Sequence, residues 1–161
     1  MKNESKKNNF IIGNCGDLKR EEDQASLIKA VRKLIAKEIN AELIFIGDGP
    51  LRENLIHLAQ KFNIAKHIHF KHNKMTATEL FEQCHVLVFS GFKVTNLELL
   101  KNAIAFKIPV IATKIESHRH LIEDGKTGFL VPCGFPERIE AALKRLEACH
   151  PEKRSDRRIS Y

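Results

Sequence analysis

One stretch of the sequence combines residues that favour the binding of an anion. Thr95 and Asn96 both suit the N-cap of a helix that the pattern predicts to start at Leu97. Backbone N–H groups at such a helix start, around Asn96 and Leu97, have no partner within the helix and attract negative charge. Lys93 adds a full positive charge just before them. The stretch therefore predicts a phosphate site, although the same cap residues would also shape the helix start without a ligand.

The elements that must position this stretch alternate between strands and helices. Apolar runs predict strands at 10–12, 43–46, 68–70, 86–89, 109–112 and 129–131, the first ending in a turn at 13–16. Amphipathic periodicity predicts helices at 24–39, 50–62, 77–84, 97–106 and 136–148, with a helical turn at 117–122. This order predicts an α/β fold, a Rossmann-like doubly wound parallel sheet of about six strands in a single domain. Ligands of such sheets bind at the carboxyl ends of the strands.

Length and composition indicate one globular domain with charged ends. Its 161 residues fit one domain, and 43% apolar with 29% charged residues is typical of a globular protein. We expect 1–9 to be a disordered leader or linker, 10–150 the folded domain and 151–161 a charged tail. The net charge of +7 lies largely in 2–7 and 153–158, and it favours anionic partners without choosing among them.

Cysteines and histidines are the residues that would indicate a metal site. The four cysteines lie far apart with no C-x-x-C pair, and no secretory signal is evident, so free thiols in a reducing cytosol are expected. His67, His69 and His72 are close in sequence. His67 and His69 alternate with apolar residues, which favours the solvent face of a short strand over metal binding. We therefore predict a cytoplasmic protein without a metal site.

Several segments, taken together and in order, resemble one known family. The run 43–52, LIFIGDGPLR, resembles the strand and G-x-G-P-L-R/E turn in the C-terminal domain of family-4 (group 1) retaining glycosyltransferases. The run 121–131, LIEDGKTGFLV, is similar to the family's I-x-D-G-x-x-G-x-L-V. Between them, 108–113 is similar to its G-x-P-V-I-A-T, and 16–18 resembles its G-R-L opening. The resemblance covers about residues 10–148.

The resemblance implies the GT-B fold, in which two Rossmann-like domains face each other across a cleft. The N-terminal domain holds the acceptor and the C-terminal domain holds the nucleotide-sugar donor. This chain resembles the second domain alone. It is expected to bind a UDP- or GDP-linked sugar without a metal, and to transfer a hexose to a glycan or lipid-linked acceptor only together with a separate or missing N-terminal domain or subunit. A lipid-linked acceptor would place the protein at the periphery of a membrane.

The resemblance places the donor diphosphate at the loop that begins with Gly16. The family has an Arg and a Lys in its G-R-L-x-x-E-K-G loop, where this sequence has Asp17 and Glu22. Carboxylates facing a diphosphate would repel it. Lys19 and Arg20 lie in the same loop and could take over by displacement, or they could be solvated loop residues.

A second family signature is a pair of glutamates eight residues apart, which meet the sugar and the ribose. Counted back from Pro109, these positions fall on Asn102 and on Val94, or on Lys93 if the loop is one residue longer. An amide at Asn102 could still bond a ribose hydroxyl, because it both donates and accepts. Glu98 lies one helical turn before Asn102 and is the nearest carboxylate, so it could face the same site. The alternative is that Glu98 is an exposed helix residue without a role in binding.

These considerations define two sets of candidate residues. The catalytic candidates are Lys19, Arg20 and Glu98. The residues expected to bind the donor are Gly16, Lys19, Arg20, Gly47, Gly49, Lys93, Thr95, Asn96, Leu97 and Asn102. Because four signature positions are altered, a non-catalytic pseudo-glycosyltransferase that acts as a binding or assembly subunit is the alternative hypothesis.

Two other classes are disfavoured. The positive charge alone suggests nucleic acid, but no RNA-recognition aromatic signature, KH loop or zinc finger is present. A dinucleotide-dependent dehydrogenase would need G-x-G-x-x-G. Neither 13–16 nor 47–52 supplies the third glycine of that motif.

Overall fold

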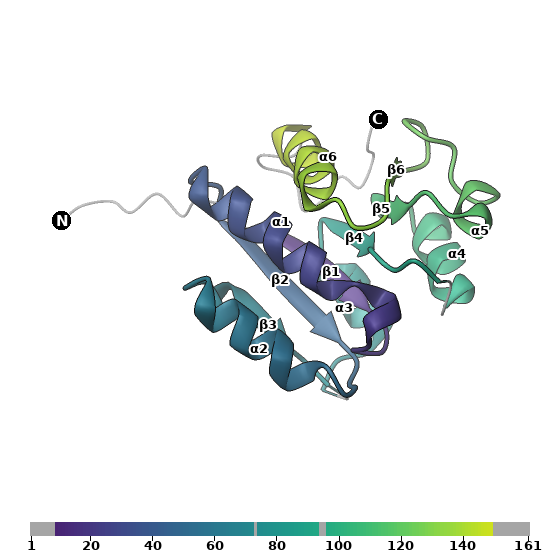
Figure 1. Ribbon diagram of the computed structural model, residues 1–161. Helices are drawn as coiled ribbons and strands as arrows, with labels where there is room; N and C mark the ends of the chain where they lie inside the picture. Colours follow the sequence, from purple (N-terminus) through teal and green to yellow (C-terminus); the bar gives the residue numbers. More distant parts are fainter. Residues whose placement is uncertain (1–8, 73, 94–95, 150–161) are drawn as a thin grey trace.

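A parallel sheet runs through this computed structural model, which describes residues 9–72, 74–93 and 96–149 (Figure 1). The strands are β1 (Phe10–Cys15), β2 (Ala41–Ile46), β3 (Ile68–Phe70), β4 (Val86–Phe89), β5 (Val110–Thr113) and β6 (Phe129–Val131). The helices are α1 (Gln24–Ala36), α2 (Arg52–Lys61), α3 (Ala77–Gln83), α4 (Leu97–Ala105), α5 (Glu116–Arg119) and α6 (Pro136–Cys149), with 3-10 turns η1 (Arg20–Glu22) and η2 (Ala65–His67).

The strand order confirms the predicted Rossmann-like fold. The order across the sheet is β3-β2-β1-β4-β5-β6, and all neighbouring strands are parallel. The chain first winds outward from β1 to β3 and then returns to place β4 on the other side of β1. In sheets of this order, ligands bind in the crevice beyond the carboxyl ends of the strands where the winding direction changes. That crevice lies beyond β1 and β4.

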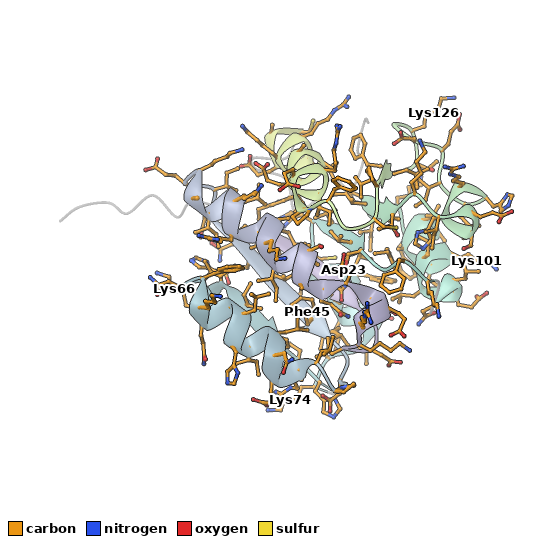
Figure 2. The ribbon with its side chains drawn as sticks, viewed as in Figure 1. Asp23, Phe45, Lys66, Lys74, Lys101 and Lys126 are labelled. Atoms are coloured by element: carbon orange, nitrogen blue, oxygen red, sulfur yellow. The ribbon has the colours of Figure 1, made fainter. Side chains whose placement is uncertain are left out.

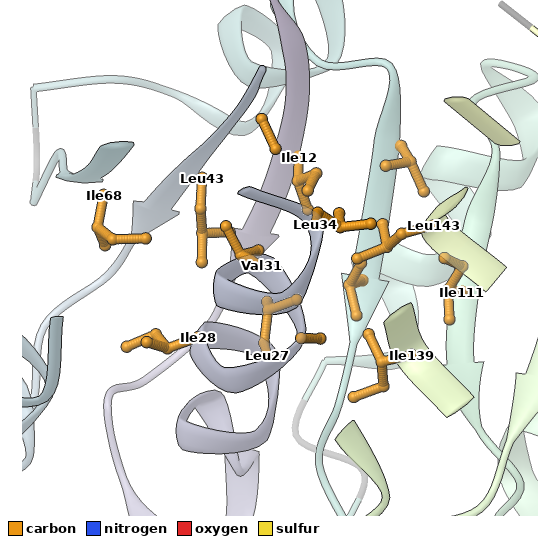
Figure 3. Packing of buried hydrophobic residues seen from close by; sticks show 14 of the residues in the cluster. Ile12, Leu27, Ile28, Val31, Leu34, Leu43, Ile68, Ile111, Ile139 and Leu143 are labelled. Carbon is orange, nitrogen blue, oxygen red and sulfur yellow. The ribbon is translucent and has the colours of Figure 1, made fainter. Parts of the chain in front are cut away.

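Helices cover both faces of the sheet because strands such as β2 carry apolar side chains on both faces. In β2, Leu43 and Phe45 belong to the core that includes α1, α2 and α6, whereas Ile44 and Ile46 belong to the core that includes α3 and α4. Figure 3 shows the first core, in which residues of α1 and α6 meet Ile12, Leu43 and Ile111 from three strands. This two-sided burial is typical of parallel sheets.

The predicted turn at 13–16 is wrong at its start, because β1 continues to Cys15. Gly13 lies inside the strand. A methyl group at Gly13 would lie 2.9 Å from Leu87 Cδ2 and 3.1 Å from Leu80 Cδ1. This glycine therefore allows α3 to pack closely on the sheet. The predicted first helix is also too long, since α1 ends at Ala36 and the backbone turns into the left-handed region at Glu38, with φ of 62°.

The histidine prediction is wrong for His67, which lies in η2 rather than in a strand. His69 is in β3, and its Nε2 lies 2.6 Å from Glu42 Oε2. His67 Nδ1 lies 3.4 Å from Glu42 Oε1, so both rings face the same carboxylate. Across the described ranges, no three His, Cys, Asp or Glu residues are grouped to bind a metal ion.

The expected leader and tail, 1–9 and 151–161, lie outside the described residues apart from Asn9. Of the helices that the structure describes, none has the length and apolar character that crossing a membrane requires.

Candidate functional site

The β1–α1 loop (16–23) and the β2–α2 loop (47–51) are joined along their backbones at the carboxyl edge of the sheet. Leu18 N–H donates to the Asp48 carbonyl at 3.0 Å, and Leu51 N–H donates to the Leu18 carbonyl at 3.0 Å. Leu18 itself is fully buried. Backbone hydrogen bonds thus connect the two loops beyond β1 and β2.

Gly47 and Gly49 make this close approach possible. Gly47 has φ of 136°, and a methyl group there would lie 2.0 Å from the Gly16 carbonyl oxygen. At Gly49 it would lie 2.4 Å from the Leu18 carbonyl oxygen. Any side chain would collide with backbone at both positions. The structure therefore gives these glycines a packing role, and their contact with a donor stays a prediction.

The β4–α4 loop, of which the structure describes 90–93 and Asn96, contacts the β1–α1 loop through its first residues. Phe92 N–H donates to the Glu21 carbonyl at 2.9 Å, and the buried Ser90 Oγ donates to the Glu22 carbonyl at 2.8 Å. These bonds bring the predicted cations of the first loop and the predicted anion-binding helix start of the second loop to the same edge.

A row of buried polar residues at the ends of β1, β4 and β5 holds this arrangement together. Asn14 Nδ2 donates to the Val88 carbonyl at 2.8 Å, and Thr113 Oγ1 donates to the Gly91 carbonyl. Asn14, Ser90 and Thr113 are each at most 2% exposed. The sequence reasoning missed these three residues. A polar residue at the end of an apolar strand was the available signal.

His118 is a buried histidine behind the same edge. Its Nδ1 lies 2.8 Å from the Thr113 carbonyl oxygen, and its ring meets Phe89 edge-on. Burial lowers the pKa of His118, and the bond to the Thr113 carbonyl partly opposes this. A neutral ring that donates from Nδ1 fits this environment and links α5 to the end of β5.

The two predicted loop cations differ in their surroundings. Lys19 Nζ lies 3.1 Å from Asp17 Oδ2, and this hydrogen bond is the main cause that raises the pKa of Lys19. Arg20 is exposed in η1. Gln24, the first residue of α1, donates from Nε2 to the Asp17 carbonyl at 2.8 Å, and this bond holds the loop backbone at Asp17. Asp17 thus sits where the family pattern has an Arg, and it neutralises part of the charge that Lys19 could offer to a ligand.

Glu22 occupies the position of the family's Lys and is buried, with 7% of its surface exposed. A methyl group at Gly16 would lie 3.4 Å from Glu22 Oε2, so the carboxylate lies against the first residue of the loop. Burial raises the pKa of the neighbouring Cys15 thiol, and the charge of Glu22 adds to that effect. The first loop therefore presents carboxylates at both positions where the family pattern has cations.

The start of α4 matches the prediction. Asn96 is the N-cap residue, and its Oδ1 accepts a hydrogen bond from Leu99 N–H at 3.0 Å. Leu97 is the first residue of the helix, and Lys93 is exposed in the loop before it. Thr95 and Val94 lie outside the described residues. N–H groups of a first helical turn precede the intrahelical hydrogen bonds and can bind an anion, although that of Leu99 is already bonded to the Asn96 side chain.

Glu98 and Asn102 are both exposed on α4. Glu98 Oε1 lies 3.1 Å from Lys101 Nζ, and Lys101 points outward from the helix in Figure 2. Asn102 lies a further turn along the helix from the carboxyl edge. The structure therefore brings Gly16, Lys19, Arg20, Lys93, Asn96 and Leu97 to one edge, with Glu98 and Asn102 on the helix that leads away from it.

The family assignment follows from a match along nearly the whole chain. The sequence profile of the family described as Glycosyl transferases group 1 matches residues 1–160, and the chain belongs to this family.

Curated relatives support this assignment at moderate identity. EpsD of Bacillus subtilis, which is named as a glycosyltransferase, is 29% identical over 148 residues, or 89% of this chain and 39% of EpsD. The N-acetyl-alpha-D-glucosaminyl L-malate synthase of Bacillus anthracis is 27% identical over 81% of this chain and 33% of the synthase. The chain thus spans well under half the length of these relatives.

Solved structures confirm the fold. HepE of Anabaena, crystallised with UDP and glucose, superposes with a TM-score of 0.78 at 19% identity, covering 86% of this chain and 38% of HepE. The C-terminal domain of LpcC from Francisella tularensis superposes with a TM-score of 0.75 at 20% identity, covering 86% of this chain and 75% of that domain. The similarity to LpcC confirms that the chain has the fold of a C-terminal domain in this family.

Proposed function

We propose that this chain is the donor half of a glycosyltransferase and binds a nucleotide sugar. Residues 10–150 form the donor domain, with a leader before it and a charged tail after it. The donor is a UDP- or GDP-linked hexose, which is transferred with retention of configuration and without a metal ion to a glycan or lipid-linked acceptor.

The observation that carries this proposal is the meeting of the β1–α1 and β4–α4 loops at the crevice of the sheet. The bond from Phe92 N–H to the Glu21 carbonyl joins them directly. In sheets of this strand order a ligand binds at that crevice. HepE, which has the same fold, was crystallised with UDP and glucose, and this supports a nucleotide sugar as the ligand.

Each candidate residue has a role in this proposal. N–H groups near Asn96 and Leu97 bind the diphosphate, together with the Lys93 side chain. Lys19 and Arg20 stabilise the negative charge that the leaving diphosphate gains.

The remaining candidates contact other parts of the donor in this proposal. Asn102 bonds a ribose hydroxyl. Glu98 is the remaining catalytic candidate, once its ion pair with Lys101 opens. Contacts from the backbone at Gly16, Gly47 and Gly49 complete the proposed donor site, and Thr95 is a further proposed donor-binding residue.

The proposed enzyme needs a second part. This chain spans between 26% and 39% of its curated relatives, so an N-terminal acceptor domain or subunit accounts for much of the remaining length. By itself the chain is then inactive in transfer. A cytoplasmic location fits this function, with peripheral membrane association if the acceptor is lipid-linked. Nucleic acid is not a proposed partner.

Thermal unfolding with nucleotide sugars tests donor binding. A ligand present at 100 times its Kd stabilises the folded chain by ~2.7 kcal/mol, which raises the melting temperature by several degrees. We expect this shift with millimolar UDP-glucose or GDP-mannose, and no shift with glucose alone. The absence of a shift with any nucleoside diphosphate sugar would contradict the proposal.

The buried carboxylate of Glu22 favours a second candidate, a non-catalytic subunit that has lost donor binding. In that case Asp17→Arg combined with Glu22→Lys should create nucleotide binding that the unaltered chain lacks. Tight binding by the unaltered chain would exclude this second candidate.

A further inference from the structure

The peptide unit between Gly91 and Phe92, at the start of the β4–α4 loop, is held at both of its ends. Its carbonyl oxygen accepts a hydrogen bond from Thr113 Oγ1 at the end of β5, and its N–H group donates to the Glu21 carbonyl at 2.9 Å. One peptide plane thus connects β5 to η1. Thr113 and Gly91 are both buried. Loss of the Thr113 hydroxyl would therefore remove a donor in the interior, where water does not readily replace it.

The hydrogen of the Thr113 hydroxyl is directed to Gly91 because its other polar neighbour cannot accept it. His118 Nδ1 lies 3.4 Å from Thr113 Oγ1 and 2.8 Å from the Thr113 carbonyl oxygen. A carbonyl oxygen only accepts, so this Nδ1 carries a hydrogen and donates. The single hydrogen of the hydroxyl is then left for the Gly91 carbonyl. The contact between α5 and β5 thus fixes the direction of the bond that holds the loop.

The residues around this peptide unit leave it little room to move. A methyl group at Gly91 would lie 2.8 Å from the Glu21 carbonyl oxygen and 3.2 Å from Glu22 Cα. The buried Ser90, one residue earlier, donates from Oγ to the Glu22 carbonyl at 2.8 Å. The first residues of the β4–α4 loop are therefore fixed from β5 and from η1 together. The exposed Lys93 follows them directly.

A loop that is fixed before a ligand arrives loses less conformational freedom on binding, and this raises the affinity. Lys93 contributes a positive charge to the proposed diphosphate site, and its backbone starts where the held peptide unit ends. If that unit were released, the loop would have to be ordered at the moment of binding. Thr113 needs no contact with the donor for this effect.

We propose that Thr113 is a positioning residue for donor binding, and that it acts on the site through the Gly91–Phe92 peptide unit. This role rests on the proposed donor-binding function. The hydroxyl group of Thr113 carries the effect, whereas its methyl group contributes only to packing. Removal of the hydroxyl should weaken the binding of a nucleoside diphosphate sugar about three- to tenfold, which corresponds to the loss of one hydrogen bond that orders the site.

Four side chains at position 113 separate the hydroxyl from the methyl group. Thr113→Val keeps the shape without the hydroxyl, Thr113→Ser keeps the hydroxyl without the methyl group, and Thr113→Ala has neither. Calorimetric titration of each whole chain with UDP-glucose, and in parallel with GDP-mannose, well below its melting temperature measures the Kd. We expect the Kd to rise about three- to tenfold from Thr to Val and from Ser to Ala, and less than about twofold from Thr to Ser. If Thr113→Val does not fold, the comparison of Ser with Ala still tests the hydroxyl.

Two further measurements distinguish positioning from a general loss of structure. Urea unfolding of Thr113→Ser should show lower stability, because a buried methyl group is lost, although binding is kept. The amide hydrogen of Phe92 should exchange with solvent faster in Thr113→Val and Thr113→Ala than in the unaltered chain or Thr113→Ser.

Thr127→Val is the matched control for the loss of a threonine hydroxyl. Thr127 is exposed, and its Oγ1 accepts from Glu123 N–H at 2.9 Å in the turn before β6. Because all strands are parallel, this turn lies at the edge of the sheet opposite the candidate site. The Kd of Thr127→Val should equal that of the unaltered chain.

Equal Kd values for all four side chains at position 113 would overturn this role and leave donor binding intact. A Kd that rises as much in Thr113→Ser as in Thr113→Val would also overturn it, because the methyl group would then matter as much as the hydroxyl. If the unaltered chain binds neither sugar nucleotide, the proposed donor-binding function fails and the role of Thr113 fails with it.

Discussion

The loops that follow β1 and β2 lie side by side at one edge of the sheet, yet they relate to the family pattern in opposite ways. The β2–α2 loop keeps the G-x-G-P-L-R pattern. The β1–α1 loop keeps Gly16, Leu18 and Glu21 of its pattern and has Asp17 and Glu22 in place of two cations. Both loops share the same backbone hydrogen bonds, from Leu18 to Asp48 and from Leu51 to Leu18.

The difference separates the requirements of packing from those of charge. Gly47 and Gly49 are kept where neighbouring backbone leaves no room for a side chain, and Leu18 is kept where its side chain is fully buried. The positions that changed, Asp17 and Glu22, are the two at which the family pattern has cations. A fold can therefore retain its loop geometry while the electrostatics of the candidate site change sign.

The largest expected effect concerns the close contact between the two loops at Gly47. Gly47→Ala places a methyl group 2.0 Å from the Gly16 carbonyl oxygen at φ of 136°, so we expect a loss of about 3–5 kcal/mol in the free energy of unfolding. Gly125→Ala is the control. It has φ of 79° and open space, and it should lose only about 1–2 kcal/mol. Urea unfolding measures both. Equal losses would show that close loop contact does not constrain Gly47.

A smaller effect is expected at the contact between the β1–α1 and β4–α4 loops. Ser90→Ala removes the buried bond to the Glu22 carbonyl and should cost about 1–2 kcal/mol of stability. Thr78→Ala, an exposed change on α3, should be nearly neutral or slightly stabilising. If Ser90→Ala is also neutral in urea unfolding, the β1–α1 loop is held by other contacts.

The β5–α5 connection extends the comparison to a buried group that titrates. Since burial lowers the pKa of His118, the unfolded chain binds its proton more readily than the folded chain. The free energy of unfolding should therefore fall as the pH falls below about 6.5, by at most ~1.4 kcal/mol per pH unit from this group. His118→Asn should reduce this slope, whereas His57→Asn, an exposed change on α2, should not. Unfolding at pH 5.5 and 7.5 measures the slopes, and an unchanged slope in His118→Asn would refute the assignment.

The smallest expected effect concerns backbone strain in the altered loop. Asp23 precedes α1 with φ of 44°, at the position where the family pattern has Gly (Figure 2). Its side chain makes no capping bond. Asp23→Gly should therefore stabilise the chain by about 0.5–1 kcal/mol. Asn63→Gly, at φ of 57°, should gain less because Asn tolerates this conformation. A destabilised Asp23→Gly variant would mean that the Asp23 side chain contributes a contact of its own.

The sheet and its helices were predictable because each strand is an apolar run that ends in a turn. Two-sided burial of 43–46 and 86–89 follows directly from continuous apolar sequence. Gly13 was misassigned to a turn because a glycine that admits a neighbouring helix looks the same in sequence as one that allows a left-handed turn. Its close contact with Leu80 and Leu87 depends on residues more than 60 positions away.

The candidate site was predictable only in part. Residues near the start of α4 carry a local signal, since Asn96 caps the helix that follows it. The burial of Glu22 and the pairing of Lys19 with Asp17 depend on how three loops meet, which spacing along the chain does not encode. Ser90 and Thr113 act through contacts with backbone carbonyls of other segments, and their residue types alone did not single them out.

The central claim is that the loops beyond β1 and β4 bind a nucleotide sugar, and amide chemical shifts of the ¹⁵N-labelled chain test it most directly. On titration with UDP-glucose or GDP-mannose, we predict the largest shifts in 16–23 and at Asn96 and Leu97. Amides at the opposite edge of the sheet, such as Ala41 and Val86, should change little. Shifts centred on that opposite edge, or none at millimolar ligand, would contradict the account.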